Sequence, residues 1–270
     1  MAVDSWNPIL FPIAFVLLLH QPLALYLYYR RRDNAPVCIL NPWNTGIANL
    51  GAGIFAFSVC VAATFQDTYP AAASILVSQS GMILCGDAFL VMAFSLFIVF
   101  NRAVGLASLN IDRKASSVQP GELNDFLQQL HWIRRLNFLL RKSTILGFLI
   151  LKQVILLVSQ SVYMATNTPN LYQMPLAESH GLPLYKRTVN IGVNTLAASV
   201  LVMIIISWKL RIVHDSLGMK QRLGRIGKGV LFGAILEMTV AQTLFTPESR
   251  VYLDVPAFIY IGIEQFIFTV

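Results

Sequence analysis

Charged residues are scarce in this chain of 270 residues. Only 12% are Asp, Glu, Lys or Arg, whereas 56% are hydrophobic, and a soluble domain is usually about one quarter charged. No polar stretch is long enough to build a second folded domain, so we expect a single domain over residues 1–270. Lipid, rather than water, is therefore the predicted solvent for most of the chain.

Signatures of catalysis and of metal binding are also missing. The three cysteines and four histidines have no metal-ligand spacing. Neither a Gly-x-Ser-x-Gly elbow nor a phosphate-binding glycine loop occurs. We therefore expect no enzyme activity, no metal and no cofactor. Retinal in particular is disfavoured, because the last apolar run lacks a lysine that could form a Schiff base.

Long apolar runs, by contrast, are abundant. A bilayer core of about 30 Å requires about 20 apolar residues in a helix, because lipid offers no partner for unpaired backbone groups. Seven runs approach this length, which predicts an all-α, polytopic membrane helix bundle. The sixth is short and the seventh stops at Val270, so six spans remain an alternative and a truncated chain is one interpretation. The predicted spans cover residues 8–29, 44–65, 75–100, 144–165, 189–212, 229–245 and 255–270.

Basic residues predict the orientation of the bundle. Of the 20 lysines and arginines, 16 lie at the end of the first, third or fifth span or in the connection after it, and cytoplasmic loops carry such an excess. The N-terminus is therefore predicted to lie outside and, with seven spans, the C-terminus inside. Because the basic residues do not gather on one soluble face, the net charge of +7 indicates contact with the lipid bilayer and not with nucleic acid. The expected location is the plasma membrane.

The longest connection, residues 101–143, contains a further helical pattern. After Pro120 and Gly121, leucines together with Phe126 and Ile133 recur at helical spacing over residues 122–140. We interpret this segment as a cytoplasmic amphipathic helix on the inner leaflet, or as an extension of span four. Membrane anchoring and partner binding both remain open as its role.

Four charged side chains lie well inside the predicted spans, away from their ends. They are Asp87, Lys152, Glu237 and Glu264. A charge in hydrocarbon is costly, so such residues usually face the bundle interior and mark functional sites. Their depths make contact among some of them feasible, and Lys152 with one or more of the three acids is the pair to test.

Uncharged polar residues extend this pattern. In span four, Gln153 and Gln160 are seven residues apart on a helix stripe that also holds Lys152, and in span five Asn190 and Asn194 are one turn apart. Such residues could line a pocket for a ligand or an ion that opens to the outside. Alternatively, they form only the interhelical hydrogen bonds and the ion pair that determine helix packing. The candidate pocket comprises Asp87, Lys152, Gln153, Gln160, Asn190, Asn194, Glu237 and Glu264.

Two segments resemble a known family. Residues 21–32, Gln-Pro-Leu-Ala-Leu-Tyr-Leu-Tyr-Tyr-Arg-Arg-Arg, followed by Asn41-Pro42-Trp43, are similar to the end of the first helix and the first inner loop of G-protein-coupled-receptor-like proteins of fungi, plants and protists, some of which carry an RGS domain. The third span is similar in ending near an arginine, Arg102, although Asn-Arg-Ala replaces the Asp-Arg-Tyr of other receptors. This resemblance implies seven helices, an outer pocket for an unknown extracellular ligand and an inner face that binds a heterotrimeric G protein.

The resemblance also implies a basic, partner-binding inner face. The alternative role of these arginines is attraction to anionic lipid. Two other functions stay open, namely a transporter or an ion- or proton-conducting protein that uses the intramembrane charges, and a non-catalytic membrane scaffold. The arginines of this face are Arg31, Arg32, Arg102, Arg222 and Arg225.

Overall fold

A computed structural model describes part of the chain, and this part is all-helical, as predicted. The described residues are 42–65, 67–115, 141–179 and 181–210, together with Pro22, Leu23, Tyr26, Tyr29, Arg30, His131, Arg135, Phe138 and Leu139. The helices within the four ranges are α3 (Pro42–Thr64), α4 (Ala71–Ala115), α6 (Lys142–Thr166), α7 (Leu176–Ser179) and α8 (Pro183–Lys209).

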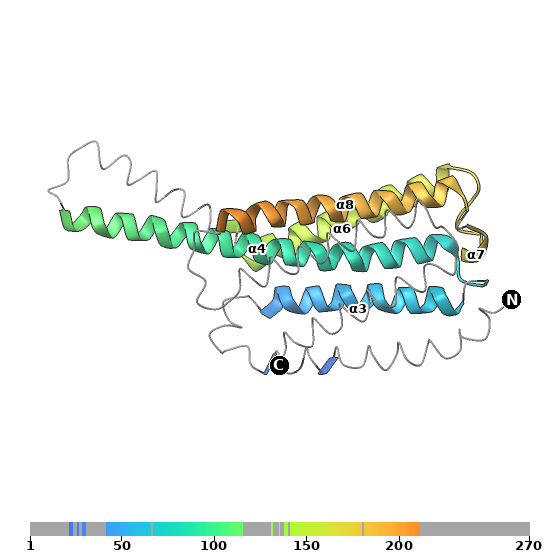
Figure 1. Ribbon diagram of the computed structural model, residues 1–270, viewed down its shortest axis with the longest axis horizontal. Coiled ribbons are helices and arrows are strands. Elements are labelled where there is room, and N and C mark those ends of the chain that lie inside the picture. Colours follow the sequence, from blue (N-terminus) through green and yellow to red (C-terminus); the bar gives the residue numbers. More distant parts are fainter. Residues whose placement is uncertain are drawn as a thin grey trace.

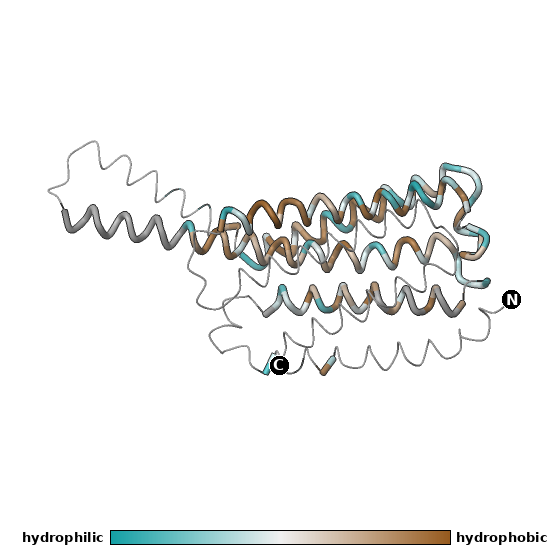
Figure 2. The backbone as a smooth tube through the Cα atoms, in the orientation of Figure 1, coloured by the Kyte–Doolittle hydropathy of each residue, from teal (hydrophilic) through white to brown (hydrophobic). Residues whose placement is uncertain are grey.

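Among the described helices, three have the length and composition to cross a membrane. They are Ala71–Asn101 within α4, Lys142–Thr166 (α6) and Pro183–Lys209 (α8), with 31, 25 and 27 residues. At a rise of about 1.5 Å per residue, each is longer than the roughly 30 Å core of a bilayer. Figure 2 shows hydrophobic residues along much of α8 and α4. These helices are compatible with an integral membrane protein.

Four of the predicted spans coincide with described helices. The spans at 44–65 and 144–165 match α3 and α6 to within two residues at each end, and the span at 75–100 lies inside α4. The fifth span overlaps α8. The spans predicted at 229–245 and 255–270 lie outside the described residues, and the span at 8–29 is described only at isolated positions.

The fifth span begins earlier than predicted. α8 starts at Pro183, six residues before the predicted residue 189, so Lys186 and Arg187 lie in its first turns and not in a loop. Proline is favourable at the first position of a helix, because its backbone angle is already helical and the missing N–H would have no partner there. Burial of Tyr185 in a hydrophobic cluster with Leu184 and Met164 further stabilises this turn.

α4 ends later than predicted. It contains 45 residues and continues to Ala115, whereas the sequence predicts a loop from Asn101. The Asn101 side-chain amide donates to the carbonyl of Phe97, 2.8 Å away and one turn earlier, and no proline follows before Ala115. Nothing therefore interrupts the helix, and Figure 1 shows its last part projecting beyond α8. The amphipathic helix predicted at 122–140 lies outside the described residues, apart from isolated positions.

α4 is the central helix of the described bundle. It packs against α3, α6 and α8, and Figure 1 shows it running between α3 and α8. One hydrophobic cluster, which includes Met164 and Tyr185, lies toward the end at which α8 begins. A second cluster, which includes Ile83, Leu156 and Met203, lies toward the other end. The packing of α6 and α8 on α4 decides which polar side chains meet.

Backbone hydrogen bonds close the end of the bundle at which α8 begins. The Ala71 and Ala72 amides at the start of α4 donate to the carbonyls of Met174 and Leu171, over 3.0 and 3.1 Å. In return, the Leu176 amide donates to the carbonyl of Tyr69, in the loop before α4, over 2.9 Å. The first N–H groups of a helix have no partner within it. The loop between α6 and α8 supplies these partners, and the ends of the three helices are thereby held together.

Candidate functional site

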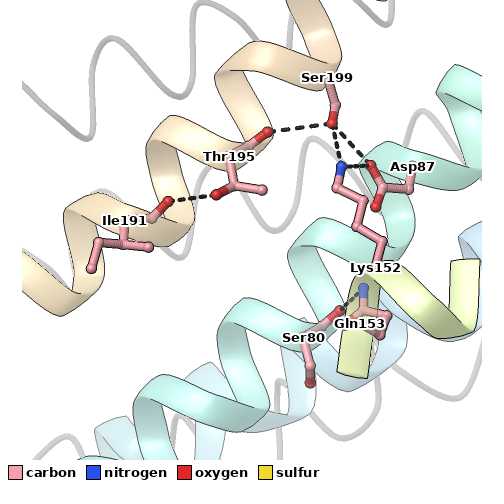
Figure 3. A network of polar contacts seen from close by, with 7 residues as sticks. All are labelled: Ser80, Asp87, Lys152, Gln153, Ile191, Thr195 and Ser199. Carbon is pink, nitrogen blue, oxygen red and sulfur yellow. Dashed lines mark hydrogen bonds and ion pairs between the residues drawn. The ribbon is translucent and has the colours of Figure 1, made fainter. Parts of the chain in front are cut away.

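Three side chains from three helices meet inside the bundle. Nζ of Lys152 in α6 lies 2.5 Å from Oδ1 of Asp87 in α4 and 2.8 Å from Oγ of Ser199 in α8. The Ser199 hydroxyl lies 2.9 Å from the same Asp87 oxygen and 3.3 Å from the Thr195 carbonyl, as Figure 3 shows. The predicted contact between Lys152 and an acid is therefore present, and the acid is Asp87. We call Asp87, Lys152 and Ser199 the ion-pair layer.

The ion-pair layer lies deep within the membrane-length part of the helices. Lys152 is ten residues after the start of α6, and Ser199 is ten residues before the end of α8. Both are therefore about 15 Å from the helix ends on that side of the bundle. Asp87 is 14 residues before Asn101, the end of the apolar part of α4, or about 21 Å away. At this depth a lone charge would be costly, which favours pairing of the lysine with the acid.

Burial of the two charges is unequal. The Asp87 side chain is 1% exposed, whereas that of Lys152 is 25% exposed. The second carboxylate oxygen of Asp87, Oδ2, is buried and has no hydrogen-bond partner within the described part of the chain. An unpaired buried acceptor costs roughly 1–3 kcal/mol. Asp87 therefore keeps the capacity to accept another hydrogen bond, from a ligand or from a rearranged helix.

A second polar layer joins the same three helices. The Gln79 amide nitrogen in α4 donates to the carbonyls of Thr188 and Val189 in α8, over 3.2 and 3.1 Å. The Gln160 amide nitrogen in α6 donates to the Gln79 side-chain oxygen. Both glutamines are buried, and each is eight residues along its helix from the charged residue of the ion-pair layer, or about 12 Å. We call Gln79 and Gln160 the glutamine layer.

Sequence reasoning missed Gln79 and Ser199. Gln79 and Asp87 are eight residues apart in an apolar run, which places them on one broad face of a helix, about 80° apart around its axis, and this spacing could have revealed Gln79. Ser199 carries no such signal, because serine in a helix often bonds to its own backbone. Gly192 in α8 has a packing role, since a side chain there would overlap the Gln79 amide.

The other predicted pocket residues do not join the ion-pair layer. Gln153 is half-buried, and its amide lies 3.5 Å from a backbone carbonyl of α4. Asn190 is half-buried, and Asn194 is exposed on the surface of α8. Glu237 and Glu264 lie outside the described residues.

Of the predicted inner face, the structure describes one position. Arg102 continues α4 directly after its apolar part, and only its helical backbone is described. α4 is one uninterrupted helix from Gln79 through Asp87 to this arginine. Arg31, Arg32, Arg222 and Arg225 lie outside the described residues.

The two layers consist of hydrogen bonds and one ion pair shared among α4, α6 and α8. A rotation or a shift of any one of these helices would therefore alter contacts in both layers. The chain matches no protein-family model, and a comparison with curated protein sequences gives no match either.

Proposed function

We propose that this chain is a G-protein-coupled-receptor-like signalling protein of the plasma membrane, with seven spans, the N-terminus outside and the C-terminus inside. An unknown ligand binds from the outside, and a heterotrimeric G protein binds the inner face. The observation that carries the proposal is the linkage of three membrane-length helices by the buried contact of Lys152 with Asp87 and Ser199.

The ion-pair layer stabilises one arrangement of α4, α6 and α8. A ligand that binds preferentially to another arrangement shifts the population toward it. The glutamine layer lies nearer the proposed outer side. A movement of α4 at Gln79 is transmitted along this helix to Asp87, about 12 Å away, and from Asp87 to Arg102, about 22 Å further. Ligand and G protein are then coupled because both favour the same arrangement of the bundle.

Replacement of Arg102 by alanine tests the inner face. Nucleotide exchange on a co-expressed heterotrimeric G protein, measured in membranes with and without the chain, is expected to fall about 5- to 150-fold, the usual range of allosteric coupling. The amount of chain in the membrane should not change, because the substitution lies beyond the apolar part of α4.

Arg141→Ala is the matched control for this experiment. Arg141 is an exposed arginine at the same end of the bundle, directly before α6, and its guanidinium lies 5.6 Å from the ring centroid of Phe138. Exchange should persist in this variant. Equal exchange by the Arg102→Ala and unaltered chains, or no stimulation by the unaltered chain, would contradict the receptor proposal.

Ion or proton transport is the second candidate, and the partial exposure of Lys152 beside the buried Asp87 favours it. For a transporter, flux of protons or small ions into liposomes that contain the chain should exceed that into empty liposomes and should be lost in Lys152→Met and Glu237→Gln. If liposomes that contain the unaltered chain show no more proton or ion flux than empty liposomes, this function is excluded. If neither exchange nor flux is found, a non-catalytic scaffold remains.

A further inference from the structure

Asn194 is a polar side chain on the surface of α8 that faces away from the described helices. It is exposed and lies 11 residues after Pro183 and 15 residues before Lys209, the two ends of the helix. These separations correspond to about 16 and 22 Å. In a membrane, this amide would therefore meet the hydrocarbon close to its centre.

The Asn194 amide makes no hydrogen bond with any described residue. Other polar side chains in these helices satisfy themselves locally: Asn101 donates to the carbonyl of Phe97 over 2.8 Å, and Thr195 donates to that of Ile191 over 2.8 Å. An unsatisfied amide in hydrocarbon is costly, because lipid tails neither donate nor accept. A partner for Asn194 must come from outside the described bundle.

The residues around Asn194 form a continuous stripe, which we call the α8 stripe. Its exposed members follow one another at spacings of three, four, three and four residues, an average of 3.5. Contact residues recur with this period in helices that pack side by side along their length. Ala198, one turn after Asn194, is small and permits close approach of a second helix. The α8 stripe comprises Ile191, Asn194, Ala198, Leu201 and Ile205.

We propose that the α8 stripe binds a second copy of this chain. Two copies inserted in the same orientation are related by a two-fold axis along the membrane normal, and such an axis brings a residue near it opposite the same residue of the other copy. Asparagine carries both a donor and an acceptor, so the two Asn194 amides can each donate to the other. This self-complementarity favours a second copy, because neither lipid nor an unrelated apolar helix would satisfy the amide.

Energy transfer between donor- and acceptor-labelled copies of the full chain in proteoliposomes measures this association. Asn194→Leu is expected to lower the association constant about tenfold or more, since one interhelical hydrogen bond contributes roughly 3- to 30-fold and the substitution removes two. Asn194→Gln, which keeps the amide, should associate within about threefold of the unaltered chain. Leu201→Ala, which trims the same stripe but removes no hydrogen bond, should cause a smaller loss.

Oxidative cross-linking provides an independent measurement. Ala198→Cys should yield a covalent dimer beyond the amount formed by the parent chain, whereas Ser159→Cys, at an exposed position on α6, should not. Thermal unfolding of Asn194→Leu should match that of the unaltered chain at a protein-to-lipid ratio low enough for both to be monomeric, because the side chain contacts no partner within the described bundle and association itself stabilises the folded chain. An unaltered chain that stays monomeric at every protein-to-lipid ratio, or an Asn194→Leu chain that associates equally well, would overturn the proposal. This inference depends on membrane insertion alone and would survive failure of the receptor proposal.

Discussion

Replacement of Lys152 by methionine is expected to lower the free energy of unfolding by about 3–5 kcal/mol, the usual cost of removing one partner from a buried ion pair. Methionine is apolar and of similar length, so packing changes little. Asp87, which is 1% exposed, nevertheless loses its cation, and Ser199 loses a hydrogen-bond donor. Unfolding in bicelles with increasing detergent, followed by tryptophan fluorescence, measures the difference.

Two further variants separate the contribution of the ion pair from the general effect of removing a lysine. Lys142→Met lies on the same helix at an exposed position, where the ammonium is 5.8 Å from the Trp43 ring centroid, and should cost less than about 1 kcal/mol. Asp87→Leu combined with Lys152→Met should recover most of the loss, because no uncompensated charge remains. Equal losses in the two lysine variants, or additive losses in the double variant, would show that the pair does not stabilise the bundle.

Replacement of Gly51 by leucine is expected to destabilise the packing of α3 on α4, at the upper end of the roughly 1–3 kcal/mol typical of overpacking. A Cβ atom at Gly51 would lie 2.6 Å from the backbone nitrogen of Cys85 and 2.7 Å from the carbonyl oxygen of Gly81. Backbone atoms cannot rotate aside as a side chain can, so the two helices would have to separate. The same unfolding measurement, together with the monodisperse fraction after detergent extraction, reports the change.

Gly147→Leu is the matched control on α6. A Cβ atom there meets nothing within 4 Å, and replacement of a helical glycine removes a penalty of about 1 kcal/mol. The control should therefore be as stable as the unaltered chain or slightly more stable. A Gly51→Leu chain that unfolds like this control would exclude close backbone contact between α3 and α4.

Four helices were predictable because long apolar runs have a strong and local signal, and three of them have the length and composition to cross a membrane. Runs of about 20 apolar residues lie close to α3, α6 and α8 and within α4. The errors are at the boundaries. Pro183 starts α8 early because it suits a first turn, and α4 continues beyond Asn101 because this residue bonds within the helix and does not stop it. Both boundaries depend on local backbone geometry and hydrogen bonding, which the hydropathy of the sequence does not reveal.

The candidate site was predictable in kind but not in detail. Lys152 needed an acid, since a lone ammonium is costly in hydrocarbon, but Asp87, Glu237 and Glu264 were equally eligible by depth. Of the glutamine layer, Gln160 is among the predicted pocket residues and Gln79 is not. Asn194 was predicted for a pocket together with Asn190, whereas its exposure motivates the proposed contact with a second copy.

The sequence by itself determined the membrane-length helices, the distribution of basic residues and the need of Lys152 for an acid. These follow from the cost of placing polar groups in hydrocarbon, which depends on composition over short windows. Only the tertiary structure decided that Asp87 is the partner, that Ser199 joins it, and that Asn194 faces away from the described helices. These contacts depend on how each helix is rotated about its axis and on which helices are adjacent. A largely apolar helix surface does not determine either until the helices pack.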